Sequence, residues 1–112
     1  MKIYIAGKIT GDPDYREKFN KAEAMLMAKG HSVMNPAWID GGSEFSWHDY
    51  MKVSATMQRV CDAALFLPGW SGSRGARREM RRAFFRRQKV FLSVDAVPGA
   101  ACAGLEHGTV KP

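Results

Sequence analysis

Residues 63–79 read AALFLPGWSGSRGARRE, and this stretch decides the fold. It begins with the apolar run 63–67, which is typical of a fully buried strand. It then passes through three glycines spaced by three and continues into an arginine-rich segment with helical periodicity. A strand, a tight turn and a helix in this order form the first part of a βαβ unit, so the stretch predicts an α/β fold.

The same alternation extends over the rest of the chain. Strands are predicted over 2–6, 31–34, 63–67 and 89–94, and a helix over 73–87. Two more helices are expected. The first begins after Asp14, which has capping-box spacing to Glu17, and this helix would end at Gly30. The second is capped by Ser46 and has Asp49 in its first turn. This order predicts a flavodoxin-like or Rossmann-like three-layer sandwich with helices on both faces of a parallel sheet.

Four to five strands in the order 2-1-3-4 would place a switch point between the first and third strands. Ligands in such sheets bind beside the carboxyl ends of the strands at that point. The segments 7–11 and 68–75 should therefore face each other across one crevice. Residues 1–95 would form this domain, and the segment 96–112, rich in Ala, Gly and Pro, would be a loosely ordered tail or a short final element.

Helical periodicity predicts which side chains face the sheet. The inner faces are expected to hold Tyr15, Phe19, Ala22 and Leu26 in the first helix; Tyr50, Val53 or Ser54, Met57, and Val60 or Cys61 in the second; and Ala76, Met80, Ala83 and Phe84 in the third.

Composition excludes several classes of protein. The 112 residues suit one domain, and with 46% hydrophobic and 25% charged residues the chain is typical of a globular protein. No apolar run approaches the roughly 20 residues of a membrane span, and the start is too short for a signal peptide. Two cysteines give no disulfide framework, which favours a cytoplasmic setting, and the scattered histidines predict no metal and no cofactor.

The glycine-rich loop and Glu79 are the candidate functional features. Backbone N–H groups at a helix start bind phosphate, but the glycines could also serve only a tight turn. Glu79 has the small residues Ala76 and Ala83 beside it on the helix, which leaves room for a ligand. Alternatively, it could be an exposed glutamate paired with Arg82 or Arg86.

Three stretches carry a resemblance to a known family: IYIAG at 3–7, VMNPA at 33–37 and CDAALFLPGWSGSRGARRE at 61–79. The chain resembles the nucleoside 2-deoxyribosyltransferase superfamily, most closely its small, often phage-encoded branch classed as DUF4406. The resemblance implies a flavodoxin-like homo-oligomer, a dimer or larger. It also implies cleavage of the N-glycosidic bond of a deoxynucleoside or its 5′-monophosphate, by hydrolysis or by transfer to a second base.

The resemblance also assigns residues. Glu79 matches the nucleophile, whereas Ser73 and Gly75 match positions that hold the 5′-phosphate, which the neighbouring Arg74 would help to neutralise. Gly7, Lys8 and Thr10 fall in the first loop, which lines the sugar and phosphate pocket.

Ser54 departs from the pattern. It stands eight residues before Asp62, where active members carry an aspartate that orients the sugar and assists the leaving base. A serine carries no charge at neutral pH. A catalytic site of Glu79 and Ser54 is therefore one hypothesis, and a non-catalytic module that binds a nucleotide or an ADP-ribose-like ligand is the alternative.

Two further features leave alternatives open. Trp70 could stack on a base or brace the loop, and Trp38 and Trp47 flank a glycine-rich loop that could be a lid or an oligomer contact. The net charge of +6 suggests an anionic partner, and much of it lies in the arginine-rich segment 77–87. We expect that segment to be a packed helix with an arginine surface rather than a nucleic-acid site. A basic nucleic-acid-binding accessory protein remains a second alternative.

Overall fold

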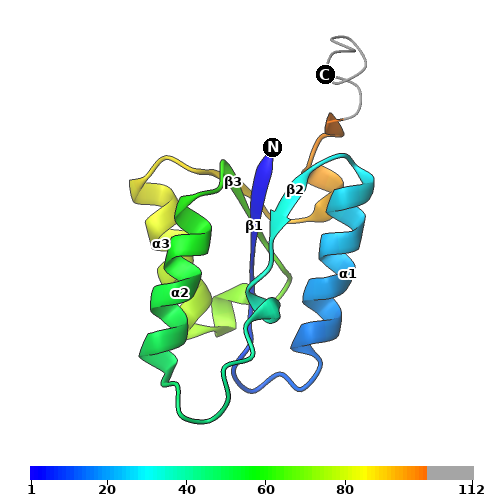
Figure 1. Cartoon of the computed structure of the whole chain (residues 1–112). Helices are drawn as coiled ribbons and strands as arrows, with labels where there is room; N and C mark the ends of the chain where they lie inside the picture. Colours follow the sequence, from blue (N-terminus) through cyan, green and yellow to red (C-terminus); the bar gives the residue numbers. More distant parts are fainter. Residues whose placement is uncertain (101–112) are drawn as a thin grey trace.

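The computed structural model describes residues 1–100. The strands are β1 (Lys2–Ala6), β2 (Ser32–Met34), β3 (Ala63–Phe66) and β4 (Lys89–Phe91). The α-helices are α1 (Tyr15–Ala28), α2 (Trp47–Arg59) and α3 (Arg74–Phe85), and the short 3-10 helices are η1 (Pro36–Trp38), η2 (Trp70–Gly72) and η3 (Val94–Ala96). The predicted alternation of strands and helices is confirmed (Figure 1).

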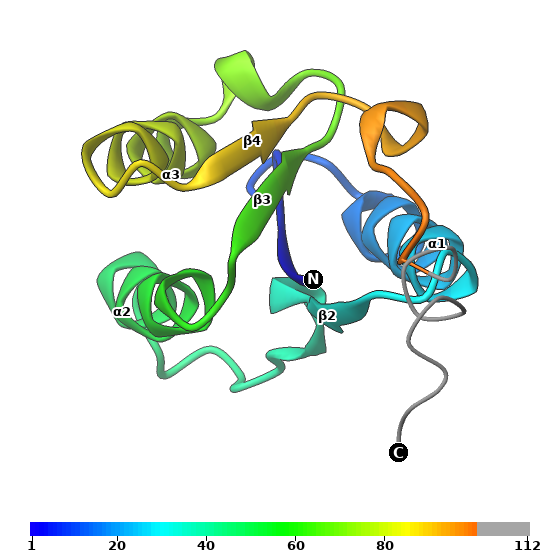
Figure 2. The ribbon, with the colours of Figure 1, turned by 90° about the horizontal axis from the view of Figure 1, so that it is seen from above.

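The four strands form one parallel sheet in the predicted order β2-β1-β3-β4. Seen from above, α1 and η3 cover one face of the sheet, and α2 and α3 cover the other (Figure 2). The loops that follow β1, β2 and β3 all lie at the lower edge in Figure 1. The predicted Rossmann-like three-layer architecture is therefore confirmed.

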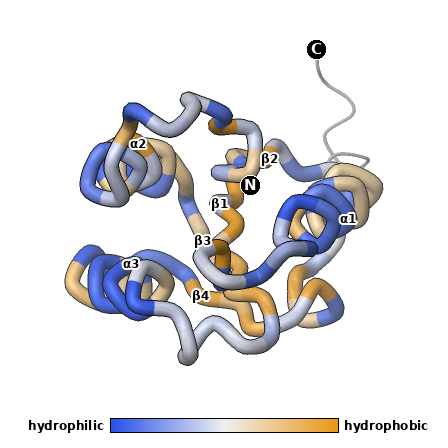
Figure 3. The backbone as a smooth tube through the Cα atoms, turned by 90° about the horizontal axis from the view of Figure 1, so that it is seen from below, coloured by the Kyte–Doolittle hydropathy of each residue, from blue (hydrophilic) through white to orange (hydrophobic). Residues whose placement is uncertain are grey.

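Alternation along β1 divides the core into two layers. Ile3 and Ile5 face α1 and pack with Phe19 and Leu26, because successive strand side chains point to opposite faces. Tyr4 lies in the other layer, with Ala6, Ala64 and Phe66, under α2 and α3. The apolar central strands run between the two layers in Figure 3. The alternation thus brings a phenol hydroxyl beneath α3.

The helix ends agree only in part with the predicted signals. Ser46 and Asp49 form a reciprocal capping box at α2, and Gly30, with φ +91°, follows the end of α1 as predicted. The capping box at Asp14 is wrong, since its side chain makes no capping hydrogen bond. Asp12 instead accepts a bond from the backbone N–H of Asp14, which sets the turn before α1.

The inner faces of α2 and α3 agree with the prediction in part. In α2, Ser54 is buried and Cys61 packs against the core, whereas their alternatives Val53 and Val60 are about half exposed. Gln58, which was not predicted there, is buried on the same face. Phe84 is also wrongly predicted, because it is 77% exposed. The face of α3 is centred on Ala76, Glu79 and Ala83, and each residue advances about 100° around the helix, so Phe84 turns outward.

The chain after β4 folds back onto α1. β4 ends at Phe91 rather than at residue 94, and Val97 is fully buried in the α1 layer. Lys29 Nζ donates to the carbonyls of Val94 and Val97, each at 2.7 Å. Residues 96–100 of the predicted tail therefore pack on the domain, whereas 101–112 lie outside the described residues. None of the helices in residues 1–100 is long and apolar enough to cross a membrane.

Candidate functional site

A cavity of about 480 Å³ opens where β1 and β3 end, at the predicted switch point. Its lining includes residues of the loops that follow β1, β2 and β3, which lie at the lower edge in Figure 1. It is lined by Tyr4, Gly7, Ile9, Thr10, Tyr15, Arg16, Pro36, Ile39, Asp40, Gly42, Trp47, Tyr50, Met51, Ser54, Ser73, Gly75, Ala76 and Glu79. The two glycine-rich segments of the sequence therefore meet at one cavity, as their spacing predicts.

Glu79 is a buried carboxyl group in the wall of this cavity. Its side chain is only 5% exposed, and Tyr4 Oη donates a hydrogen bond to Glu79 Oε2. Burial raises the pKa of Glu79 to about 7, although the Tyr4 hydroxyl, the charge of Arg82 and the Ser54 hydroxyl lower it in part. The alternative of an exposed glutamate in a surface ion pair is therefore wrong.

The same contact acts on Tyr4. Burial and the neighbouring Glu79 carboxylate raise the pKa of the Tyr4 phenol well above its usual value. The phenol therefore stays protonated and serves as a hydrogen-bond donor to the carboxylate. Tyr4 was predicted only as a strand residue; the signal that could have marked it is an aromatic hydroxyl two residues before the end of β1.

Ser54 and Gln58 connect α2 to this group. Ser54 is 6% exposed, and its hydroxyl donates to the Met51 carbonyl at 3.3 Å. Gln58 Nε2 donates to the main-chain oxygen of Glu79 at 2.9 Å. Gln58 Nε2 also donates to the side-chain oxygen of Gln88. Gln88 in turn donates to the main-chain carbonyls of Gln58 and Cys61. This buried amide pair fixes the turn of α3 that carries the carboxyl group.

The loop before α3 brings a helix start to the cavity. Gly69 has φ +86°, a left-handed conformation that glycine adopts readily, and it leads into η2. Ser73 Oγ then caps α3 by accepting from the N–H of Ala76 at 3.1 Å. A Cβ at Gly75 would lie 3.2 Å from Met51 Sδ, so glycine permits the close approach of α3 to α2. Ser73 and Gly75 thus hold the first turn of α3 at the cavity wall.

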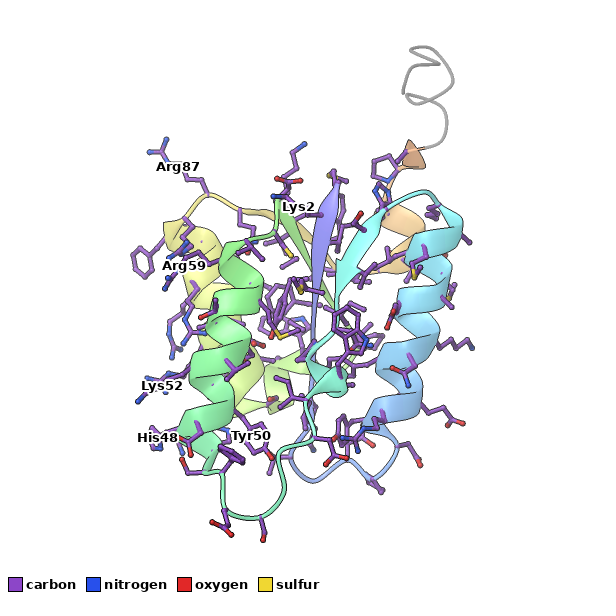
Figure 4. All side chains as sticks on the ribbon, in the orientation of Figure 1. Lys2, His48, Tyr50, Lys52, Arg59 and Arg87 are labelled. Atoms are coloured by element: carbon purple, nitrogen blue, oxygen red, sulfur yellow. The ribbon has the colours of Figure 1, made fainter. Side chains whose placement is uncertain are left out.

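Aromatic and charged side chains that were not predicted as site residues surround the cavity mouth. Tyr50 Oη donates to the Gly42 carbonyl at 3.2 Å and ties the glycine-rich loop to α2; Figure 4 shows its side chain at the foot of that helix. Arg16 donates to the carbonyls of Ala37 and Ile39, each at 3.2 Å. Arg16 lies in the first turn of α1 and Tyr50 in the first turn of α2, and both donate to carbonyls of the segment between β2 and α2. No sequence spacing relates either residue to Glu79.

Most, but not all, of the predicted site residues meet at the cavity. Those that line it are Gly7, Thr10, Ser54, Ser73, Gly75 and Glu79. Lys8 is exposed beside it, and Arg74 lies over the ring of Trp47 at 4.1 Å. Trp70 packs edge-on against Phe66 with ring centroids 5.4 Å apart, so within this structure it braces the loop.

Within residues 1–100, no group of three or more His, Cys, Asp or Glu side chains is placed to hold a metal ion. The cavity wall presents one buried carboxyl group, its phenol partner and a helix start.

Fold and site together define an α/β protein of the Rossmann type with a carboxyl-bearing cavity at its switch point. The chain belongs to the family described as Domain of unknown function (DUF4406), which matches residues 1–92. Its fold is similar to that of a 2-deoxyribosyltransferase from the psychrotolerant bacterium Bacillus psychrosaccharolyticus, with a TM-score of 0.62 and 21% identity over 80% of this chain and 69% of that chain. No curated protein matches the chain.

Proposed function

We propose that the protein cleaves the N-glycosidic bond of a deoxynucleoside or its 5′-monophosphate, with Glu79 as the nucleophile. The observation that carries the proposal is the buried Glu79 carboxyl group, held by Tyr4 in the wall of a cavity that also includes a helix start. The fold shared with a 2-deoxyribosyltransferase supports the same class of chemistry.

The contacts of Glu79 suit a covalent mechanism. Tyr4 donates to Oε2, which leaves Oε1 to attack the anomeric carbon of the sugar. The bond from that carbon to the base breaks, the base leaves with the electron pair and takes a proton from solvent water, and a glycosyl ester forms on Glu79. Water or a second base then attacks the same carbon and releases the carboxylate, so the overall reaction is hydrolysis or transfer.

The start of α3 suits the 5′-phosphate of a nucleotide substrate. The first N–H groups of a helix have no partner within the helix, and the helix dipole favours an anion there. Ser73 and Gly75 lie at this position in the cavity, within two helical turns of Glu79. A nucleotide could therefore place its phosphate at the helix start and its sugar at the carboxyl group.

Ser54 favours a second candidate function on the same scaffold. The residue lies beside Glu79, where the family resemblance expects an aspartate, and a hydroxyl group cannot protonate a leaving base at neutral pH. The protein could instead hold a nucleotide or an ADP-ribose-like ligand without cleaving it. The Ser54→Asp variant tests this difference, because restoring the acid should create or increase turnover only if its absence limits the reaction.

Chromatography of released base tests the proposal. The protein is incubated with each deoxynucleoside and each 5′-monophosphate, alongside the Glu79→Gln variant, and thermal shifts are recorded for the same compounds. Base release that depends on Glu79 supports the enzyme. A ligand-induced thermal shift without release supports the binding module, since any ligand specific to the folded state stabilises it.

A further inference from the structure

The helix α3 and the residues that follow it carry a concentrated positive charge. The segment 74–87 holds seven arginines and a single acid, the buried Glu79. Within residues 1–100, none of these arginines forms an ion pair with a carboxylate. One guanidinium nitrogen of Arg82 is buried with no hydrogen-bond partner among the described residues. Arg82 acts electrostatically on Glu79, and the segment as a whole keeps a large excess of positive charge in the part of the protein that the structure describes.

Two aromatic rings are exposed within the same segment. Phe84 is 77% exposed and Phe85 is 80% exposed, although burial would stabilise both. Their rings meet edge to face with centroids 5.7 Å apart. Phe85 also lines an open depression of about 340 Å³ whose other walls are Arg78, Arg81, Arg82 and Arg86. We call this depression and the two rings the α3 arginine face.

The basic surface extends beyond this face. Arg74 and Arg78 lie over the ring of Trp47, at 4.1 and 5.6 Å, and Trp47 also lines the candidate cavity. Lys52 and Arg59 on α2 point outward on the same side of the molecule as Arg87 (Figure 4). A long polyanion could therefore follow α3 from the cavity mouth to its last turn.

We propose that the α3 arginine face binds single-stranded nucleic acid. Guanidinium groups neutralise the phosphates, and exposed aromatic rings provide surfaces on which unpaired bases stack. In a duplex the bases are already stacked, so the rings would contribute little. The rings are interleaved with arginines instead of forming the continuous apolar side by which an amphipathic helix enters a membrane.

A second copy of the chain fits the face less well. A two-fold interface sets the same patch against itself, and here it would place the two arginine clusters opposite each other. The proposal does not depend on turnover at Glu79, so Glu79→Gln should bind the strand as the native chain does. A failure of the proposed cleavage reaction can therefore be told apart from a failure of strand binding at the α3 arginine face.

The experiment measures fluorescence anisotropy with a labelled 20-nucleotide oligo(dT) and the full chain at several salt concentrations. About four phosphate contacts predict a slope of about −3 in log affinity against log salt, which is roughly a 50-fold loss between 50 and 200 mM. The double variant Arg81→Ala with Arg86→Ala should make the slope less negative by about one to one and a half. Phe84→Ala with Phe85→Ala should weaken binding by about fivefold or more per ring at an unchanged slope.

Matched controls lie on α1, on the other side of the sheet. Lys21→Ala removes an exposed positive charge, and Met25→Ala with Met27→Ala removes two exposed apolar side chains. Both variants should leave the affinity and the slope unchanged. Circular dichroism melts establish that each variant is folded.

Three results would overturn the proposal. The first is the absence of oligonucleotide binding at 50 mM salt, or binding that neither α3 variant weakens. The second is binding to vesicles of anionic lipid but not to the oligonucleotide. The third is a dimer by analytical ultracentrifugation that Phe84→Ala with Phe85→Ala converts to monomer, which would make the face an interface between copies.

Discussion

The charge of Glu79 should destabilise the fold at neutral and alkaline pH, and Glu79→Gln should remove that cost. The pKa of Glu79 rises from 4.5 to about 7 on burial, a difference of about 2.5. At 1.36 kcal/mol per pKa unit, folding with an ionised Glu79 costs about 3 kcal/mol. The side chain is 5% exposed, so solvent screening reduces this figure little.

The sign of the effect determines the pH window. Below about pH 4.5 the carboxyl group is protonated in both states, and the native chain and Glu79→Gln should differ by a constant amount. Between about pH 4.5 and 7, Glu79 loses its proton in the unfolded chain before it does so in the folded chain. The protein with Glu79 therefore loses free energy of unfolding relative to the Glu79→Gln variant over this range. Above about 7 the difference should remain constant at its maximum.

Urea unfolding of both proteins between pH 4.5 and 8.5 measures this difference. We expect the advantage of Glu79→Gln to grow by about 3 kcal/mol over that range, which corresponds to roughly 10–20 °C in the melting temperature of a domain of this size. Glu17→Gln, at an exposed position on α1, is the matched control and should show no such rise. A pH-independent difference for Glu79→Gln would refute the reasoning.

Three further predictions concern the same site. If base is released, its rate should rise with pH through about 7, because the nucleophile must be ionised; a rate that falls over that range would assign Glu79 a different role. Tyr4→Phe removes a hydrogen bond that lowers the pKa of Glu79, so the midpoint of that profile should move to higher pH, and an unchanged midpoint would remove Tyr4 from the account. Gln58→Leu leaves the main-chain oxygen of Glu79 without its donor and should lower the free energy of unfolding by about 1–3 kcal/mol, measured in urea, whereas the exposed change Lys52→Ala should not.

The sheet order and the place of the cavity could be predicted from the sequence. Buried parallel strands are short apolar runs, and right-handed crossovers leave few topologies open. For Glu79 the residues alone left two readings open, a site residue or a surface ion pair, and the resemblance to the nucleoside 2-deoxyribosyltransferase superfamily assigned it to the site.

Tyr4, Gln58 and the outward side chain of Phe84 could not be predicted in the same way. Tyr4 meets Glu79 across 75 positions of sequence, and only the strand register decides which face its hydroxyl takes. Gln58 was not predicted because a hydrophobic stripe selects apolar residues; it is buried because its amide donates to the Glu79 main-chain oxygen in α3 and to the Gln88 side chain. Phe84 shows that a rotation of about one residue around a helix reverses the exposure of a large side chain.

Mass spectrometry of quenched single-turnover reactions tests the central claim most directly. The protein, in excess over a deoxynucleoside 5′-monophosphate, is quenched in acid during the first turnover, digested and mapped, while released base is measured in the same samples. The account predicts a sugar adduct on the peptide that contains Glu79, and neither adduct nor released base with Glu79→Gln. Base released with no adduct on Glu79, or with an adduct on another residue, would contradict it.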